Sequence, residues 1–477
     1  MRTEHRVKDR TIAGRSAGLW FASLAALAPA SFLGCTVTPK PLTPVAVASE
    51  VEDRATTIGE TLQALDSSGF APLFSEPPET DAMHADAGTT WHAFAWAYSR
   101  ETVTARRRLL AARARVNSTG LPGPIGLGAE TLEFDDVERQ TQARMTFDLL
   151  GLVGLGRSAA AEHLATAEER YAYGELEQAV WSSRFAVDRA RVRVAAAAVR
   201  VAVLEDLVGE VDADTKRFDL LDDRGWLPPD QVAAARAMAD RLRRRAASAR
   251  AEAAESLDAL AKAAGLPLRS EILADITANT LEGFAPLAAV EPVPEAAELL
   301  RRQPELRVKR LEYAVAEARL RRVAAEAWPD LRIGPRLRLD ANSSLVGGVL
   351  DLSLPWPGSV TGLVDAAQQE RELARELLED SLVSVLATAT SRRVAFTQAQ
   401  EILRRYGPTI ETGTASAWRA ARARFAVDPG ALMTWTDRLE RRIQGCVAAL
   451  DAQEQAILAE LNYRDVIGAR TRPEDRR

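Results

Sequence analysis

Side chains that commonly bind metals or act as nucleophiles are rare in this chain of 477 residues, which has two cysteines and four histidines. Cys35 and Cys446 lie far apart in unlike contexts, and the histidines show no metal-ligand spacing. We find no Gly-rich phosphate loop, no nucleophile elbow and no convincing acid–base pair. The many carboxylates fall in helical patterns, where they typically form solvated faces. The sequence therefore predicts no metal site, no cofactor and no enzyme activity.

The first 35 residues predict a secretory signal. A basic segment up to Arg15 precedes an apolar segment that ends in small residues, which is typical of a signal peptide rather than a spanning helix. The segment ends in FLGC at 32–35, which is similar to a bacterial lipoprotein box with Phe32 in the place of the usual leucine. We expect Cys35 to be lipidated, and Thr36 offers no inner-membrane retention signal, so the outer membrane is favoured. The alternative is an ordinary cleaved signal with a bystander cysteine.

Composition favours long helices. The chain is 47% hydrophobic and 27% charged, with abundant Ala, Leu, Arg and Glu and few aromatic residues, as in coiled-coil proteins. The net charge is -6 and both signs are interspersed, so no basic patch indicates nucleic-acid binding.

The helical patterns occur in two similar halves. From about Ser158, apolar residues recur every seven positions between Tyr173 and Val208, which predicts a rod of about 50 residues. Gly225 and the pair Pro228-Pro229 then indicate a turn into a second helix. The order helix, strand pair, long helix, turn, helix occurs twice, which predicts an internal duplication. The expected helices are about 90–116, 158–222, 229–264, 293–327, 360–405 and 431–466.

One short stretch, 331–358, departs from this helical pattern. Apolar and charged residues alternate there in two runs of about ten residues, the length that a tilted strand needs to cross a bilayer. Such alternation is typical of a membrane β-barrel, and Trp328 and Trp356 flank the runs where a membrane interface would lie. The expected lipid-facing residues are Leu331, Ile333, Leu337, Leu339, Leu350, Leu352 and Leu354, and the expected lumen-facing residues are Arg332, Arg336, Arg338, Asp340 and Asp351.

A weaker alternation around Met145 and Phe147 supplies a strand pair in the first half. Four strands cannot close a barrel, and an open sheet edge in lipid leaves unpaired backbone groups that cost several kcal/mol each. Copies of the chain must therefore share one barrel. The alternative is two small hairpins that pack on a helical bundle.

Several segments carry a family resemblance. Pro304-Glu305-Leu306 precedes an alanine-rich helix that ends in Trp328-Pro329-Asp330-Leu331, and "LSLPWPG" leads from the strands into the next long helix. "RGWLPPDQVAAARAMADRL" is similar to a helix-hairpin tip, and "LAELNYRDVIGA" to the end of the last helix. Over about residues 90–467, the chain resembles the TolC-like outer-membrane efflux proteins, many of which are lipoproteins.

The resemblance implies a homotrimer in which each chain gives four strands to one barrel and helices to a periplasmic tunnel. It also implies that the hairpin tips dock on a periplasmic adaptor protein, which connects the channel to an inner-membrane transporter, and that the channel conducts passively. The expected docking residues are Arg224, Gly225, Trp226, Leu227, Asp428, Pro429 and Gly430. A second hypothesis is a non-conducting periplasmic coiled-coil lipoprotein that acts as scaffold or adaptor.

The expected fold class is mostly α with a small β part. Long antiparallel coiled-coil helices form two tandem repeats, each with a two-strand hairpin. The expected segments are a signal peptide at 1–34, an extended arm at 35–90, a first repeat at 91–265, a linker at 266–293, a second repeat at 294–467 and a tail at 468–477.

Overall fold

A computed structural model describes residues 87–119, 126–133, 139–148, 156–266, 290–326, 330–340, 343–353 and 361–469, all within one compact unit, Pro78–Arg477. The predictions for the signal peptide, the lipidated Cys35 and the tail after 469 lie outside the described residues. So do those for Leu354 and for the flanking Trp328 and Trp356.

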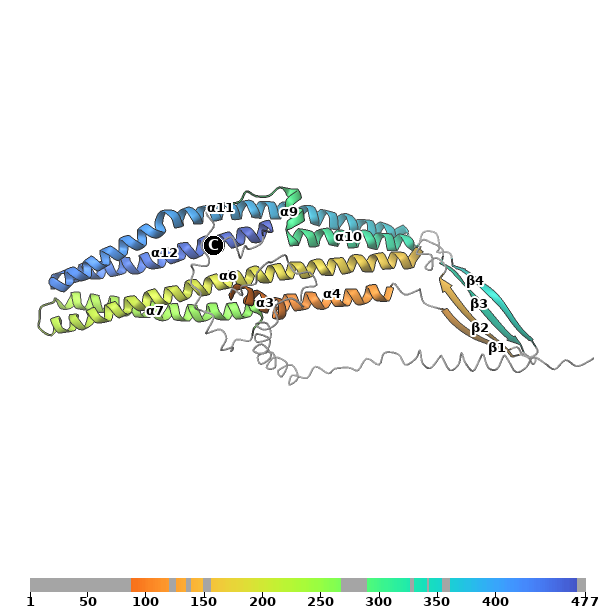
Figure 1. Cartoon of the computed structure of the whole chain (residues 1–477), viewed down its shortest axis with the longest axis horizontal. Helices are drawn as coiled ribbons and strands as arrows, with labels where there is room; N and C mark the ends of the chain where they lie inside the picture. Colours follow the sequence, from red (N-terminus) through yellow and green to blue (C-terminus); the bar gives the residue numbers. More distant parts are fainter. Residues whose placement is uncertain are drawn as a thin grey trace, which may run out of the picture. The chain divides into compact units, whose positions relative to one another are not determined.

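Two long helical hairpins make up most of the described chain (Figure 1). The first joins α6 (Gly156–Asp222) to α7 (Pro229–Ala264), and the second joins α11 (Thr361–Val427) to α12 (Leu432–Ile467) through a short 3-10 turn. The hairpins match in length, with 67 residues in α6 and in α11 and 36 residues in α7 and in α12. In the core, α12 packs on α6 and α7, so the two hairpins lie against each other.

The long helix of the second half ends later than expected. The expected end lay near Arg405, shortly before Gly407-Pro408. Proline in a helix interior removes a hydrogen bond and clashes with the preceding turn, so the local sequence disfavours a continuous helix there. The helix α11 instead continues to Val427. Packing on both sides overrides the local preference, with Phe396 stacked on Tyr463 before the proline and Trp418 against Trp435 after it.

In each half of the chain, a further helix expected from the sequence is divided into two shorter helices. The expected helix at 90–116 is divided into α3 (Ala87–Tyr98) and α4 (Arg100–Thr119), and the expected helix at 293–327 into α9 (Ala296–Arg302) and α10 (Pro304–Ala325). The helices α4 and α10 both pack on α6, and α10 also packs on α11.

The two breaks lie against equivalent glycines. Gly265 follows α7 and Gly468 follows α12, with left-handed φ angles of 74° and 69° that complete the helix ends. A Cβ atom on Gly265 would lie 2.4 Å from the carbonyl of Tyr98, and one on Gly468 would lie 2.8 Å from the carbonyl of Arg302. Each glycine thus lets the end of one helix approach the break in another.

The strands form one four-stranded antiparallel sheet in the order β1-β2-β3-β4. They are β1 (Gly126–Glu133), β2 (Arg139–Asp148), β3 (Asp330–Asp340) and β4 (Ser343–Ser353). The strands of the first half therefore pair with those of the second through β2 and β3. Figure 1 shows the sheet beyond the ends of α4, α6, α10 and α11. At that junction, Arg157 of α6 donates to the backbone carbonyl of Glu326, at 2.9 Å.

Candidate functional site

The register of the sheet gathers apolar residues on one face. Ile333 lies opposite Phe147 on one side and Leu350 on the other, and Leu337 lies opposite Val346. This face is not covered by the chain's own helices, because Ile333 is 45% exposed, Val346 76% and Leu350 68%. Large apolar side chains gathered on one exposed face mark a contact with lipid or with another apolar surface.

The opposite face carries the charges. Arg332 lies opposite Asp351, Arg336 lies opposite both Arg144 and Gly347, and Arg338 lies opposite Gln142 and Leu345. Arg336 also donates a hydrogen bond to the side-chain amide of Gln142. Leu345, 63% exposed, is an apolar residue on this charged face. The apolar face therefore suits contact with lipid or another apolar surface, and the charged face suits contact with water.

The register sorts the strand residues expected from the sequence onto two faces. The expected apolar residues Ile333, Leu337, Leu339, Leu350 and Leu352 share one face, and Arg332, Arg336, Arg338 and Asp351 share the other. Leu331 pairs with Leu352, and Asp340 with Ser343.

The sequence predicted the strand around Met145 and Phe147, β2, but sequence reasoning missed its pairing with β3. Its apolar Ala143 and Phe147 join the same face as Leu337 and Ile333, and its Arg144 joins the charged face. The alternation in β2 was visible, but a pairing with a strand almost 200 residues later leaves no local signal.

The ends of the two helical hairpins are the second candidate surface. In the α6–α7 turn, Gly225 has a φ of 66°, Trp226 is 62% exposed, and the Arg224 guanidinium lies over the Trp226 ring at 5.5 Å. Leu227 is buried in the core below, so its side chain holds the turn in place.

The α11–α12 turn is built differently. The Asp428 carboxylate accepts a hydrogen bond from the Gly430 backbone N–H at 2.9 Å, and Pro429 begins the 3-10 turn. Exposed apolar side chains that the sequence analysis did not single out lie near both turns: Leu220, Val427 and Met433. With Trp226, they give the hairpin ends an apolar character.

A buried cluster supports these ends. The Trp435 ring meets Phe218 edge-on with centroids 4.9 Å apart, and its indole N–H donates to Asp214 at 2.9 Å. Arg422 binds the same carboxylate through two nitrogens, at 2.8 and 3.1 Å. The hydrogen bond to Asp214 raises the pKa of Arg422 above its ordinary value. Trp418 lies against Trp435, so the cluster joins α6 to both helices of the other hairpin.

A partly buried contact between His92 and Asp188 joins α3 to α6. His92 Nε2 lies 2.7 Å from Asp188, and an Arg191 nitrogen lies 3.8 Å from it. Burial raises the pKa of Asp188, but the hydrogen bond from His92 and the charges of His92, Arg184 and Arg191 outweigh it and hold the pKa below its ordinary value. The ionised carboxylate therefore serves as a structural contact.

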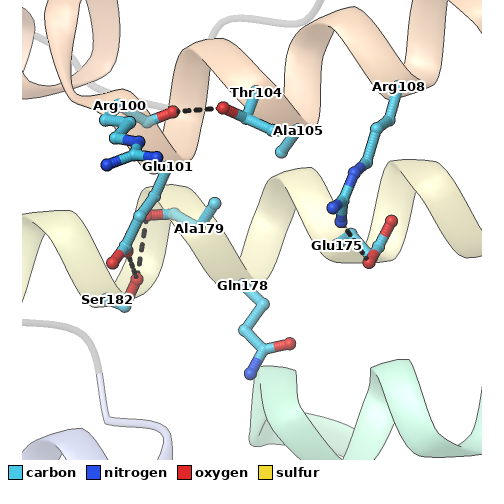
Figure 2. A pocket seen from close by; sticks show the side chains of 9 residues that line it. All are labelled: Arg100, Glu101, Thr104, Ala105, Arg108, Glu175, Gln178, Ala179 and Ser182. Carbon is cyan, nitrogen blue, oxygen red and sulfur yellow. Dashed lines mark hydrogen bonds and ion pairs between the residues drawn. The ribbon is translucent and has the colours of Figure 1, made fainter.

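A groove of about 500 Å³ between α4 and α6 has the polar lining of an interhelical contact (Figure 2). Arg108 pairs with Glu175 at 3.1 Å, and the Ser182 hydroxyl lies 3.1 Å from both Glu101 and the Ala179 carbonyl oxygen. None of the described residues that line this groove is a histidine or a cysteine. Its side chains tie α4 to α6.

The described residues also lack two further features. No group of three or more His, Cys, Asp or Glu side chains there could hold a metal ion. No helix of that part of the chain has the length and apolar character needed to cross a membrane.

Solved structures share this arrangement of helices and strands. A membrane protein from Pseudomonas aeruginosa superposes with a TM-score of 0.69 at 14% identity, over 80% of this chain and 93% of that one. The outer-membrane channel OprN gives a TM-score of 0.67 at 17% identity, over 80% and 90% of the two chains. The chain has the fold of the TolC-like outer-membrane channels. The open state of the Neisseria gonorrhoeae MtrE channel, which has the same fold, gives 0.66 at 14% identity, over 80% and 89%. No protein-family model and no curated protein matches the sequence.

Proposed function

We propose that the chain is the outer-membrane channel subunit of a tripartite efflux system and conducts its cargo passively from the periplasm to the exterior. The observation that carries this proposal is the two-faced sheet, with exposed apolar residues on one side and arginines on the other. A barrel wall in a membrane has this character, because its outer surface contacts hydrocarbon and its inner surface contacts water.

The edges of the sheet support a shared barrel. Within the described strands, β1 and β4 each have a neighbour on one side only. In hydrocarbon, an unpaired backbone group costs several kcal/mol, so both edges need partner strands. The family resemblance sets the number of copies at three, and four strands from each of three copies give a barrel of twelve. Each β4 edge would then pair with the β1 edge of the next copy.

An internal duplication accounts for the matching halves. The equal lengths of the two hairpins support it, as does the way Gly265 and Gly468 approach the breaks at Ser99 and Gln303. In a trimer, two similar halves per chain would give the helices an approximate six-fold arrangement around a periplasmic tunnel.

The hairpin ends suit a protein partner. Trp226, Val427 and Met433 are exposed there above a buried aromatic cluster, and Arg224 lies beside Trp226. Exposed aromatic and arginine side chains are frequent in protein interfaces. We propose that these ends dock on a periplasmic adaptor, which links the channel to an inner-membrane transporter, and that a lipid on Cys35 anchors each subunit in the outer membrane.

The descriptions of the structural neighbours also support a channel function. OprN is described as an outer-membrane channel, CmeC as the outer-membrane channel of Campylobacter jejuni, and the CusC structures as showing transmembrane channel formation. These descriptions apply to those proteins, and the proposal extends the class of activity to this chain.

Conductance tests the proposal. We expect the mature protein, extracted from membranes with detergent, to migrate as a heat-modifiable trimer and to give discrete ion-conducting steps in planar bilayers. A non-conducting scaffold lipoprotein would need no barrel. A silent monomer, or loss of the membrane-bound protein on carbonate washing, would therefore favour a scaffold and contradict the channel.

A further inference from the structure

Two arginines lie at the same level on the charged face of the sheet. Arg144 of β2 lies directly opposite Arg336 of β3. The adjoining positions at that level are glycines, with Gly128 opposite Arg144 in β1 and Gly347 opposite Arg336 in β4. No carboxylate occupies this row of the sheet, and the row lies near the middle of the eleven-residue strand β3.

This row differs from the next row toward the helices that contains an arginine. There, Arg332 lies opposite Asp351, so an acid faces the base directly. Like charges directly opposite each other destabilise a pair of strands. The pairing of Arg144 with Arg336 therefore costs stability that a single neutral substitution would recover.

The surroundings of the pair keep the charges accessible. Arg144 and Arg336 are both exposed, and the hydrogen bond from Arg336 goes to the neutral amide of Gln142. Among the described residues, no atom lies within 4 Å of the place where a side chain at Gly347 would begin, so the space beside Arg336 is open. Two guanidinium groups with open space beside them present a positive surface to whatever passes over this face.

We infer that Arg144 and Arg336 form a positively charged ring in the barrel lumen that favours anionic cargo over cationic cargo. This inference rests on the proposed channel function. Two arginines from each of three subunits would place six positive charges at one level. Rings of arginine or lysine side chains select anions in pores, because the low-dielectric wall focuses their field on the lumen. The favoured cargo carries carboxylate or phosphate groups, which arginine binds through paired hydrogen bonds.

Reversal potentials in planar bilayers test the inference. With a potassium chloride gradient across the bilayer, we expect chloride to permeate the wild-type channel more readily than potassium. The double variant Arg144→Gln with Arg336→Gln should lose that preference, because the like-charged row disappears. The matched variant Arg144→Lys with Arg336→Lys should keep it, since the charge remains.

The outcomes separate the inference from the proposed function. Two results would contradict the arginine ring but not the channel function. One is a wild-type channel that conducts but prefers potassium, and the other is a glutamine variant with unchanged chloride preference. A wild-type protein that forms no conducting trimer overturns both. Because glutamine removes a like-charge contact, the glutamine variant should still assemble, which its heat-modifiable migration verifies.

Discussion

Replacement of Gly334 by valine is expected to prevent assembly of the membrane sheet. A Cβ atom at this position would lie 1.7 Å from the carbonyl oxygen of Met145 and 2.7 Å from its carbonyl carbon. Both contacts are with backbone, which cannot rotate away as a flexible side chain can. The strands β2 and β3 would have to separate, and this pairing joins the two halves of the chain. The measurement is the fraction of membrane-bound protein that migrates as a trimer without heating.

The expected cost exceeds that of ordinary overpacking, about 1–3 kcal/mol, because the pairing of the two strands is lost as well. Gly347→Val is the matched control. Gly347 lies in the neighbouring strand of the same sheet, but no atom of the part of the chain that the structure describes lies within 4 Å of a Cβ atom there. The control should assemble as the wild type does. If Gly334→Val gave as much trimer as Gly347→Val, β2 and β3 would not pair as described.

Replacement of Trp435 by alanine is expected to lower the thermal stability of the helical hairpins strongly. Trp435 is fully buried, contacts the rings of Phe218 and Trp418, and donates a hydrogen bond to Asp214. Truncating a buried tryptophan typically costs about 3–5 kcal/mol, and here Asp214 also loses a donor. Thermal unfolding followed by circular dichroism measures the effect.

Met433→Ala provides the control for this second substitution. Met433 lies two residues earlier in the same helix and is 51% exposed. Its loss should change the unfolding free energy by about 0.5 kcal/mol or less, as for most surface substitutions. Equal melting temperatures for the two variants would show that the aromatic cluster does not hold the hairpin ends together.

The elements with strong local signals were predicted well from the sequence. The helix Pro229–Ala264 has the expected bounds, because Pro228-Pro229 begins it and Gly265 ends it. The strands β3 and β4 pair with the alternation that the sequence shows. The mostly helical fold with a small sheet and the likeness to TolC-like channels are confirmed at the level of fold.

The features that sequence reasoning missed depend on contacts between distant segments. A helix end was expected near Arg405, but packing on Tyr463 and Trp435 continues α11 past Gly407-Pro408. The breaks at Ser99 and Gln303 coincide with glycines that follow other helices. The join between β2 and β3 likewise has no local signal.

At the hairpin ends, the sequence did not predict which single residues are exposed. Leu227 was expected to face a docking partner, yet it is 4% exposed, while its neighbour Trp226 is 62% exposed. Val427, next to the expected Asp428, is 87% exposed. Which side of a turn faces outward depends on how the hairpin packs, and the sequence of the turn does not state it.

The central claim is that one face of this sheet contacts hydrocarbon and the other contacts water. Two adjacent residues of β4 test it, because Val346 lies opposite Leu337 on the apolar face and Leu345 lies opposite Arg338 on the charged face. Both are exposed apolar side chains, at 76% and 63%. An aspartate therefore changes both positions in the same way.

The decisive measurement is the yield of heat-modifiable trimer in the outer membrane for Val346→Asp and for Leu345→Asp. We predict that Val346→Asp sharply reduces the yield, since a charge on the lipid face of a barrel is destabilising. The cost is about 2–4 kcal/mol for Arg or Lys at the midplane and less for an acidic residue. Leu345→Asp should assemble normally, because it would face water and Arg338. Equal yields for the two variants would contradict the claim that this sheet separates lipid from an aqueous lumen.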